Sequence, residues 1–176
     1  MQEFQSFRPL YDPTAVQPMR DELVNVGVRE LKSPEEVDEV FVPAEGTVFL
    51  TVNSVCGCAA GNARPGAMLA LQNKVIPDQS VTVFAGQDRD ATDKARGYVK
   101  DYAPSSPCMV LFKDGKVETI LERHMIEGRS PQDIAAHLVD AFNRTCSRPG
   151  PSIPAEEFAK IVPSNICGSS IPRHGD

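Results

Sequence analysis

Residues 47–66, "TVFLTVNSVCGCAAGNARPG", place two cysteines directly after an apolar, β-branched run. An apolar run without alternation is typical of a central strand that is covered on both faces. The alanine-rich residues after Cys58 have helical spacing, and Pro65 and Gly66 predict a kink in that helix. The stretch therefore predicts a strand that leads into a helix, with Cys56 and Cys58 in the turn between them.

The flanking sequence predicts an alternating order of helices and strands. Two helices are expected before the stretch, one from Pro18 and one from Pro34 with Ser33 as its N-cap. After it we expect a strand over "SVTVFAG", a polar helix, a hairpin with Asp114–Gly115 as its turn, and a last helix capped by Ser130. A β-α-β unit followed by a hairpin gives an α/β fold with a four-stranded mixed sheet and helices on both faces.

The chain of 176 residues fits one domain with an extension at each end. Residues 1–17 are polar and turn-rich, and we expect them to form an arm. Residues 18–146 contain the predicted sheet and helices. Residues 147–153 include two prolines and a glycine, so 147–176 is expected to be a linker and tail with one short helix.

The composition excludes several classes of partner. A net charge of -6 argues against a nucleic acid or an anionic membrane. No apolar stretch approaches the roughly 18 residues of a membrane span, and the first ten residues do not resemble a secretory signal. We therefore expect a cytoplasmic protein, in which most of the five cysteines are thiols.

The position of Cys56 favours its ionisation. A thiol attacks a disulfide only as thiolate, and a free cysteine with a pKa of about 8.5 is mostly protonated at neutral pH. A helix N-terminus offers unpaired N–H groups and about half a positive charge. We therefore expect a depressed pKa for Cys56, helped by the amides of Gly57 and Cys58. Gly57 is also expected to take the unusual backbone angles that so short a disulfide loop requires.

Three interpretations of the Cys-Gly-Cys pair are open. The cysteines could be structural and buried in the turn. They could bind a metal or an iron–sulfur cluster, although the other cysteines and histidines are scattered without a second close pair. Thiol–disulfide exchange is the interpretation that the helix-end position favours, because a strained short disulfide suits exchange and shuffling.

Four ordered motifs resemble the bacilliredoxins, which are thioredoxin-like proteins with a Cys-Gly-Cys motif. The motifs are "VNSVCGCAAGNARP", "VTVFAGQDRDAT", "APSSPCMVLFKDGK" and "ERHMIEGRSPQDI". The resemblance covers residues 18–146 and implies a thioredoxin-like fold with two extra N-terminal helices and a C-terminal extension. It implies an oxidoreductase that removes a small thiol, bacillithiol or one like it, from mixed disulfides on client proteins. The small thiol is then a co-substrate, and no bound cofactor or metal is expected. The alternatives are a general protein disulfide isomerase, or a carrier of zinc or an iron–sulfur cluster that uses a third cysteine.

The resemblance also assigns roles to single residues. Cys56 would attack first, and Cys58 would close the short disulfide or resolve the adduct. Pro107 would be a cis-proline that packs against the motif and shapes the groove for a substrate disulfide.

Other residues are expected to support this site. Asn53 and Gly57 lie beside the motif cysteines in the sequence. Arg64 is the preferred positive charge near the thiolate or the small thiol, with a solvent-exposed helix face as its alternative. Arg123 and His124, expected in the last strand, are the other candidates for such a charge.

Three cysteines outside the motif are candidate resolving thiols. Cys108 follows the predicted cis-proline, where the family commonly has serine, and its alternative role is that of a small core residue. Cys146 closes the last helix, and Cys167 lies on the tail. A homodimer is a further candidate assembly for the chain.

Overall fold

The computed structural model describes residues 7–161 and 172–173, and its centre is a mixed sheet of five strands. In the order in which they lie side by side, the strands are β1 (Arg29–Glu30), β4 (Gln79–Phe84), β2 (Thr47–Asn53), β5 (Cys108–Lys113) and β6 (Lys116–Leu121). β4 runs parallel to β1 and β2, whereas β5 is antiparallel to β2 and β6. The predicted α/β class is confirmed. The predicted four strands are wrong, because the two-residue strand β1 adds an edge beside β4.

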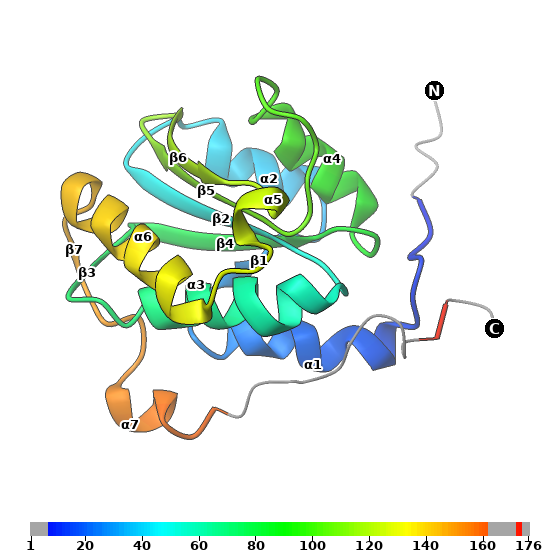
Figure 1. Ribbon diagram of the computed structural model, residues 1–176. Coiled ribbons are helices and arrows are strands. Elements are labelled where there is room, and N and C mark those ends of the chain that lie inside the picture. The colour runs from blue at the N-terminus through cyan, green and yellow to red at the C-terminus, as the bar shows by residue number, and fades with distance from the viewer. Residues whose placement is uncertain (1–6, 162–171, 174–176) are drawn as a thin grey trace.

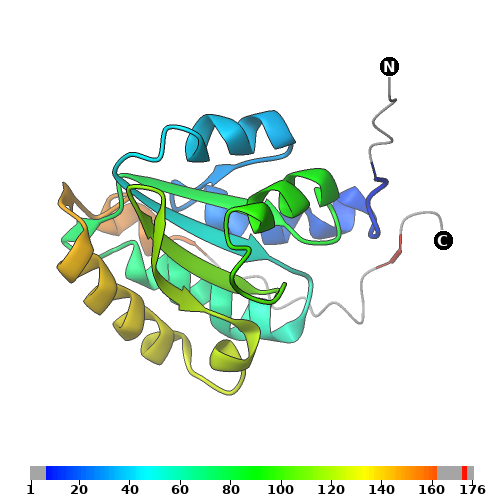
Figure 2. The same ribbon diagram turned by 90° about the horizontal axis from the view of Figure 1, so that it is seen from above.

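Helices cover both faces of this sheet (Figures 1 and 2). They are α1 (Pro13–Val24), α2 (Pro34–Phe41), α3 (Arg64–Ala70), α4 (Arg89–Gly97), α5 (Arg123–Ile126), α6 (Pro131–Thr145) and α7 (Ala155–Phe158). One apolar cluster joins α3 and α6 to sheet residues such as Met109, and another joins α2 and α4 to residues such as Val110. Met109 and Val110 are successive residues of β5 and belong to different clusters, so β5 is buried on both faces. Within the described residues, no helix has the length and apolar character needed to cross a membrane.

α1 begins earlier than the sequence predicts. Asp12 caps it, because its Oδ1 accepts hydrogen bonds from two backbone N–H groups of the first turn, at 2.8 and 3.0 Å. Pro18 therefore lies inside the helix rather than at its start. The expected arm over residues 1–17 is wrong from residue 13 onward, and residues 1–6 lie outside the described part of the chain.

Several local signals are confirmed. Ser33 and Glu36 form a complete capping box at the start of α2, and Ser130 caps α6. Asp114 and Gly115 both have positive φ, at 49° and 79°, as a tight hairpin turn between β5 and β6 requires.

The segment after α6, which we expected to be a linker, pairs with a strand of the domain. β3 (Val75–Ile76) and β7 (Arg148–Pro149) form a separate antiparallel pair, and the Gly150 N–H donates to the Lys74 carbonyl at 2.8 Å. A side chain at Gly150 would collide with backbone atoms of the loop before β3. The short helix expected in this region is confirmed as α7.

Candidate active site

The two motif cysteines lie where β2 ends and a helix begins. β2 ends at Asn53 and helical conformation begins at Gly57, so Cys56 directly precedes the first helical turn. The predicted position of Cys56 at a helix N-terminus is confirmed, and free backbone N–H groups there favour an anion. Gly57 is itself helical while the cysteines are thiols. The expectation of unusual backbone angles at Gly57 is therefore wrong for this form.

The helix after the motif is irregular, as Pro65 and Gly66 predict. The irregularity is a π-helical turn, η1 (Ala59–Ala63), which precedes α3. Since proline lacks an N–H and clashes with the carbonyl four residues earlier, a wider turn accommodates Pro65. Gly66 packs closely on α6, because a Cβ there would lie 2.6 Å from Ile134 Cγ2. This contact fixes the helix that follows the motif.

The motif cysteines are partly exposed free thiols whose sulfur atoms lie 2.8 Å apart. Ser54 is a polar neighbour of Cys56 in the turn, since its Oγ accepts the N–H of Cys56 at 3.1 Å. The Ser54 side chain also hydrogen-bonds the Cys56 sulfur and favours its ionised form. Sequence analysis did not single out Ser54, although a polar Asn-Ser pair at the end of an apolar strand is a usable signal.

The two motif thiols have pKa values that move in opposite directions. Burial raises the pKa of Cys56, but hydrogen bonds from Cys58, Ser54 and the Ala59 amide, together with the charge of Arg123, outweigh it and leave the pKa lowered. Burial, together with the hydrogen bond and the charge of Cys56, raises the pKa of Cys58 to about 11. Cys56 therefore ionises first, in the direction that the sequence predicts. The stabilising amide is that of Ala59, one residue beyond the two amides that we expected.

Arg123 supplies a positive charge beside the motif. It lies in α5 and not, as expected, in a strand. Its backbone N–H donates to Ser105 Oγ at 2.8 Å, and its Nε donates to Glu127 at 2.6 Å. It lines an open cavity of about 500 Å³ together with His124, Glu122 and the loop before Pro107. The charge of Arg123 also acts on both motif thiols, so one wall of this cavity carries a charge that influences the motif.

Pro107 follows a cis peptide bond from Ser106, as the family resemblance implies. It is buried and directly precedes β5. The first residue of β5, Cys108, pairs with Val52 near the end of β2. The cis-proline and the motif are therefore at the same end of the central sheet.

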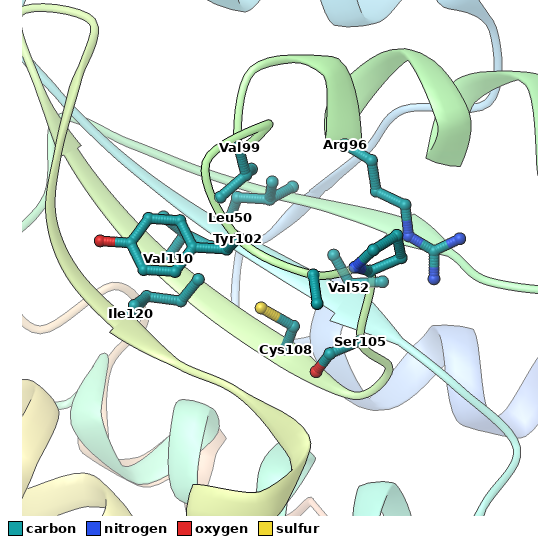
Figure 3. Close-up of a pocket in the computed structure, with 11 residues that line it drawn as sticks. Leu50, Val52, Arg96, Val99, Tyr102, Ser105, Cys108, Val110 and Ile120 are labelled. Atoms are coloured by element: carbon teal, nitrogen blue, oxygen red, sulfur yellow. The ribbon is translucent and has the colours of Figure 1, made fainter.

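Cys108 faces away from the motif helix. Its side chain belongs to the apolar cluster under α2 and α4, whereas its neighbour Met109 belongs to the cluster under α3 and α6. Figure 3 shows the sulfur among the apolar side chains of a pocket that includes Leu50 and Val52. Burial raises the pKa of Cys108 to about 12. The prediction of Cys108 as a resolving thiol is therefore wrong, because the alternation of side chains along β5 places it on the face of the sheet opposite the motif helix.

Cys146 lies at the other end of the sheet. Burial raises the pKa of Cys146, and its side chain hydrogen-bonds Thr47, the first residue of β2. The motif follows the last residue of β2, and a seven-residue strand spans about 20 Å. Cys146 is therefore a packing residue of α6 rather than a resolving thiol. Cys167 lies outside the described residues.

Arg64 is buried, so the alternative of a solvent-exposed helix face is wrong. Its side chain is 0% exposed and pairs with Glu22 of α1, with Nε and Oε2 2.6 Å apart. Asn53, which we predicted as a supporting residue, is also buried and accepts a hydrogen bond from Arg64. Sequence analysis missed Glu22. Its signal is its place on the apolar face of α1, three residues after the buried Met19.

Metal ligands are sparse around the motif. Among residues 7–161 and 172–173, no group of three or more histidine, cysteine or acidic side chains is arranged to hold a metal ion. Structural zinc sites are almost always four-coordinate. A metal held by the two motif sulfurs would therefore need further ligands from elsewhere.

Comparisons with known proteins agree with these features. A family model described as disulphide isomerase matches residues 11–146. A bacilliredoxin of Halalkalibacterium halodurans is 52% identical over 132 residues, which cover 75% of this chain and 90% of that protein. A bacilliredoxin of Bacillus licheniformis is 52% identical over 132 residues, covering 74% and 92%, and one of Staphylococcus aureus is 47% identical over 137 residues, covering 78% and 94%. The name of the family model and those of the relatives together support a redox function at thiols, and the chain belongs to the bacilliredoxin family.

Proposed function

We propose that the chain is a thiol–disulfide oxidoreductase that removes a small thiol of the bacillithiol type from mixed disulfides on client proteins. The observation that carries the proposal is the pair of motif thiols at the start of a helix, where the pKa of Cys56 is lowered and that of Cys58 is raised to about 11. The names of the related proteins support the same chemistry. A parallel β2–β4 pair, an antiparallel β5–β6 hairpin and a cis-proline beside the motif support a thioredoxin-like fold.

The first step is attack by the Cys56 thiolate on the mixed disulfide. It strikes the sulfur of the small thiol, so a new disulfide joins Cys56 to the small thiol and the client leaves as a thiolate. No electrons are gained or lost overall, because one disulfide replaces another. The lowered pKa of Cys56 increases the fraction of thiolate, and its partly exposed sulfur can meet a client.

The second step frees Cys56. Cys58 loses its proton to solvent, attacks the Cys56 sulfur and releases the small thiol as a thiolate, which leaves a Cys56–Cys58 disulfide. Once the adduct has formed, Cys56 no longer bears the negative charge that raises the pKa of Cys58. A thiol reductant must then supply two electrons to reopen this disulfide before the next cycle.

The surface around the motif suits a client protein. Gly57 is exposed, and Arg123, whose charge acts on both motif thiols, lines an open cavity together with Ser106. An extended client segment could therefore place its disulfide against the cis-proline loop. We propose a cytoplasmic setting for this reaction, because thiols there are kept reduced.

Paired cysteine variants test the proposal. A protein carrying a mixed disulfide with bacillithiol is incubated with each variant, and mass spectrometry follows the client and the enzyme. Cys56→Ser is expected to release no small thiol, whereas Cys58→Ser is expected to release the client once and keep the small thiol on Cys56. Equal residual activity in both variants would contradict the assigned order.

A general protein disulfide isomerase is the second candidate function, and the description of the matching family model favours it. The two functions differ in substrate. An isomerase would reactivate a scrambled protein that carries no small thiol, at a rate similar to its removal of bacillithiol. The function proposed here predicts that removal of the small thiol is the faster reaction.

A further inference from the structure

We propose that the buried ion pair between Glu22 and Arg64 positions Cys56 for attack, acting through Ser54, so that α1 is part of the redox site. The inference deepens the proposed function, because it rests on Cys56 as the nucleophile. Arg64 and Glu22 are positioning residues in this proposal, since neither touches the reacting sulfur.

Arg64 holds the backbone and side chain of the residues before the motif. Its Nη1 donates to the Ser54 carbonyl at 2.9 Å and to Asn53 Oδ1 at 3.1 Å. The Ser54 N–H donates to the same Asn53 Oδ1 at 2.8 Å. The guanidinium therefore fixes both ends of the residue that contacts Cys56.

Ser54 connects this arrangement to the nucleophile. Its Oγ accepts the Cys56 N–H at 3.1 Å, and its hydroxyl hydrogen-bonds the Cys56 sulfur. A displacement of Ser54 therefore changes both the position of Cys56 and the stability of its thiolate.

α1 holds the residues before the motif in place. Glu22 of α1 accepts the Arg64 Nε at 2.6 Å, and Asn53 Nδ2 donates to the Met19 carbonyl at 3.2 Å. Val55, the residue before Cys56, packs in one apolar cluster with Val16 and Met19. Three successive residues, 53–55, are thus connected to the same helix or its ion pair.

Stability alone does not account for Arg64. A buried ion pair is often no more stabilising than apolar residues of similar volume, because removing two charges from water is costly. Arg64 is fully buried, and among residues 7–161 and 172–173 its Nη2 finds no hydrogen-bond partner, which adds a further cost. The contacts of the other two guanidinium nitrogens explain why an arginine is buried here. Nε binds Glu22, and Nη1 binds Asn53 and the Ser54 carbonyl.

The test measures the pH profile of Cys56 alkylation in the full chain, with iodoacetamide as the probe and mass spectrometry of the modified peptide. Arg64→Lys keeps a positive charge beside Glu22 but loses the fork of donors that holds Ser54 and Asn53. Ser54→Ala removes only the hydroxyl. Each variant is expected to raise the midpoint of the profile and to slow alkylation at neutral pH about two- to tenfold, as loss of one hydrogen bond would.

The double variant sharpens this test. If Arg64 acts through Ser54, Arg64→Lys combined with Ser54→Ala shifts the midpoint by less than the sum of the single shifts. An unchanged midpoint in folded Arg64→Lys, or additive shifts, would overturn the positioning role. Glu22→Gln replaces Arg64→Lys in the cycle if circular dichroism shows that the lysine variant does not fold.

Arg20→Lys is the matched control. Arg20, in α1, is mostly buried like Arg64 of α3, but it pairs with Glu30 and Asp88 and not with the residues before the motif. Arg20→Lys is expected to lower the melting temperature and to leave the pH profile of Cys56 alkylation unchanged. A shift of the midpoint equal to that of Arg64→Lys would count against the proposal. The other charged and titratable groups that act on Cys56, namely Cys58 and Arg123 of α5, stay the same in all variants. Alkylation needs no client, so this test can fail while the cysteine variants still support the proposed function.

Discussion

Cys56 and Cys108 lie at the same end of the central sheet, yet their chemistry differs. Cys56 follows the end of β2, and Cys108 begins β5 opposite Val52. The pKa of Cys56 is lowered, whereas burial raises that of Cys108 to about 12. Nearness to the cis-proline therefore does not by itself lower the pKa of a cysteine.

The surroundings of the two sulfur atoms explain the contrast. Cys56 receives hydrogen bonds from a thiol, a hydroxyl and a backbone amide, and it is partly exposed. Cys108 is 6% exposed and lies among apolar side chains, which do not stabilise an anion. Polar contacts in the turn therefore decide which of the two thiols ionises more readily.

The largest expected effect separates these two cysteines directly. Cys56→Ser should abolish release of the small thiol, because it removes the attacking sulfur. Cys108→Ala should keep more than half of the wild-type rate, since the buried thiol has no part in the reaction. Release of the small thiol from a client, followed by mass spectrometry, provides the measurement. Comparable losses in both variants would remove the distinction between the two sites.

The next effect concerns the partner of Cys56. Cys58→Ser should stop turnover after one cycle and leave the small thiol on Cys56, because no second thiol displaces it. Intact-protein mass spectrometry should detect this adduct at one per chain. Rapid loss of the adduct without added reductant would show that another group resolves it.

A change of stability tests whether the helix after the motif is held as closely as its packing indicates. Gly66→Ala should destabilise the fold by about 1–3 kcal/mol, because the new methyl group would meet Ile134 on α6. Gly61→Ala is the matched control on the same helix, since a Cβ there would meet no heavy atom of the described residues within 4 Å. Urea denaturation compares the two variants. Equal stability of both would argue against tight packing at Gly66.

The smallest expected effect concerns Arg123. Its positive charge favours the Cys56 thiolate, so Arg123→Gln should raise the pKa of Cys56 and slow its alkylation at neutral pH by about twofold. High salt should reduce the difference between variant and wild type, because exposed charges are screened. Arg144→Gln is the control, as Arg144 also forms an exposed pair with an acid four residues away. A shift in the control as large as that in Arg123→Gln would contradict a local effect.

The sequence predicts those parts of the fold whose signals are local. The capping box at Ser33, the hairpin turn at Asp114 and the strand-to-helix turn at Cys56 each depend on neighbouring residues, and the structure confirms them. The cis bond before Pro107 follows from the family resemblance and is also confirmed. β1 was missed because two residues carry no periodicity, and its pairing with β4 is a tertiary effect.

The candidate site shows the same limit. A lone arginine on a helix is usually solvated, and nothing near Arg64 in the sequence indicates its partner Glu22, which lies 42 residues earlier. Strand alternation could have placed Cys108 on the opposite face from Met109, but the face covered by the motif helix is set by the crossover. The sequence therefore did not predict the contacts between residues that lie far apart in the chain.

The most direct test of the account titrates both sulfur atoms in the same unmodified chain. Isotope-coded alkylation at a series of pH values, read by mass spectrometry of the Cys56 and Cys108 peptides, gives the two profiles at once. We predict a midpoint for Cys56 below the ordinary value of about 8.5, with Cys108 unlabelled throughout the neutral range. A Cys56 midpoint at or above that value, or labelling of both thiols at the same pH, would contradict the account.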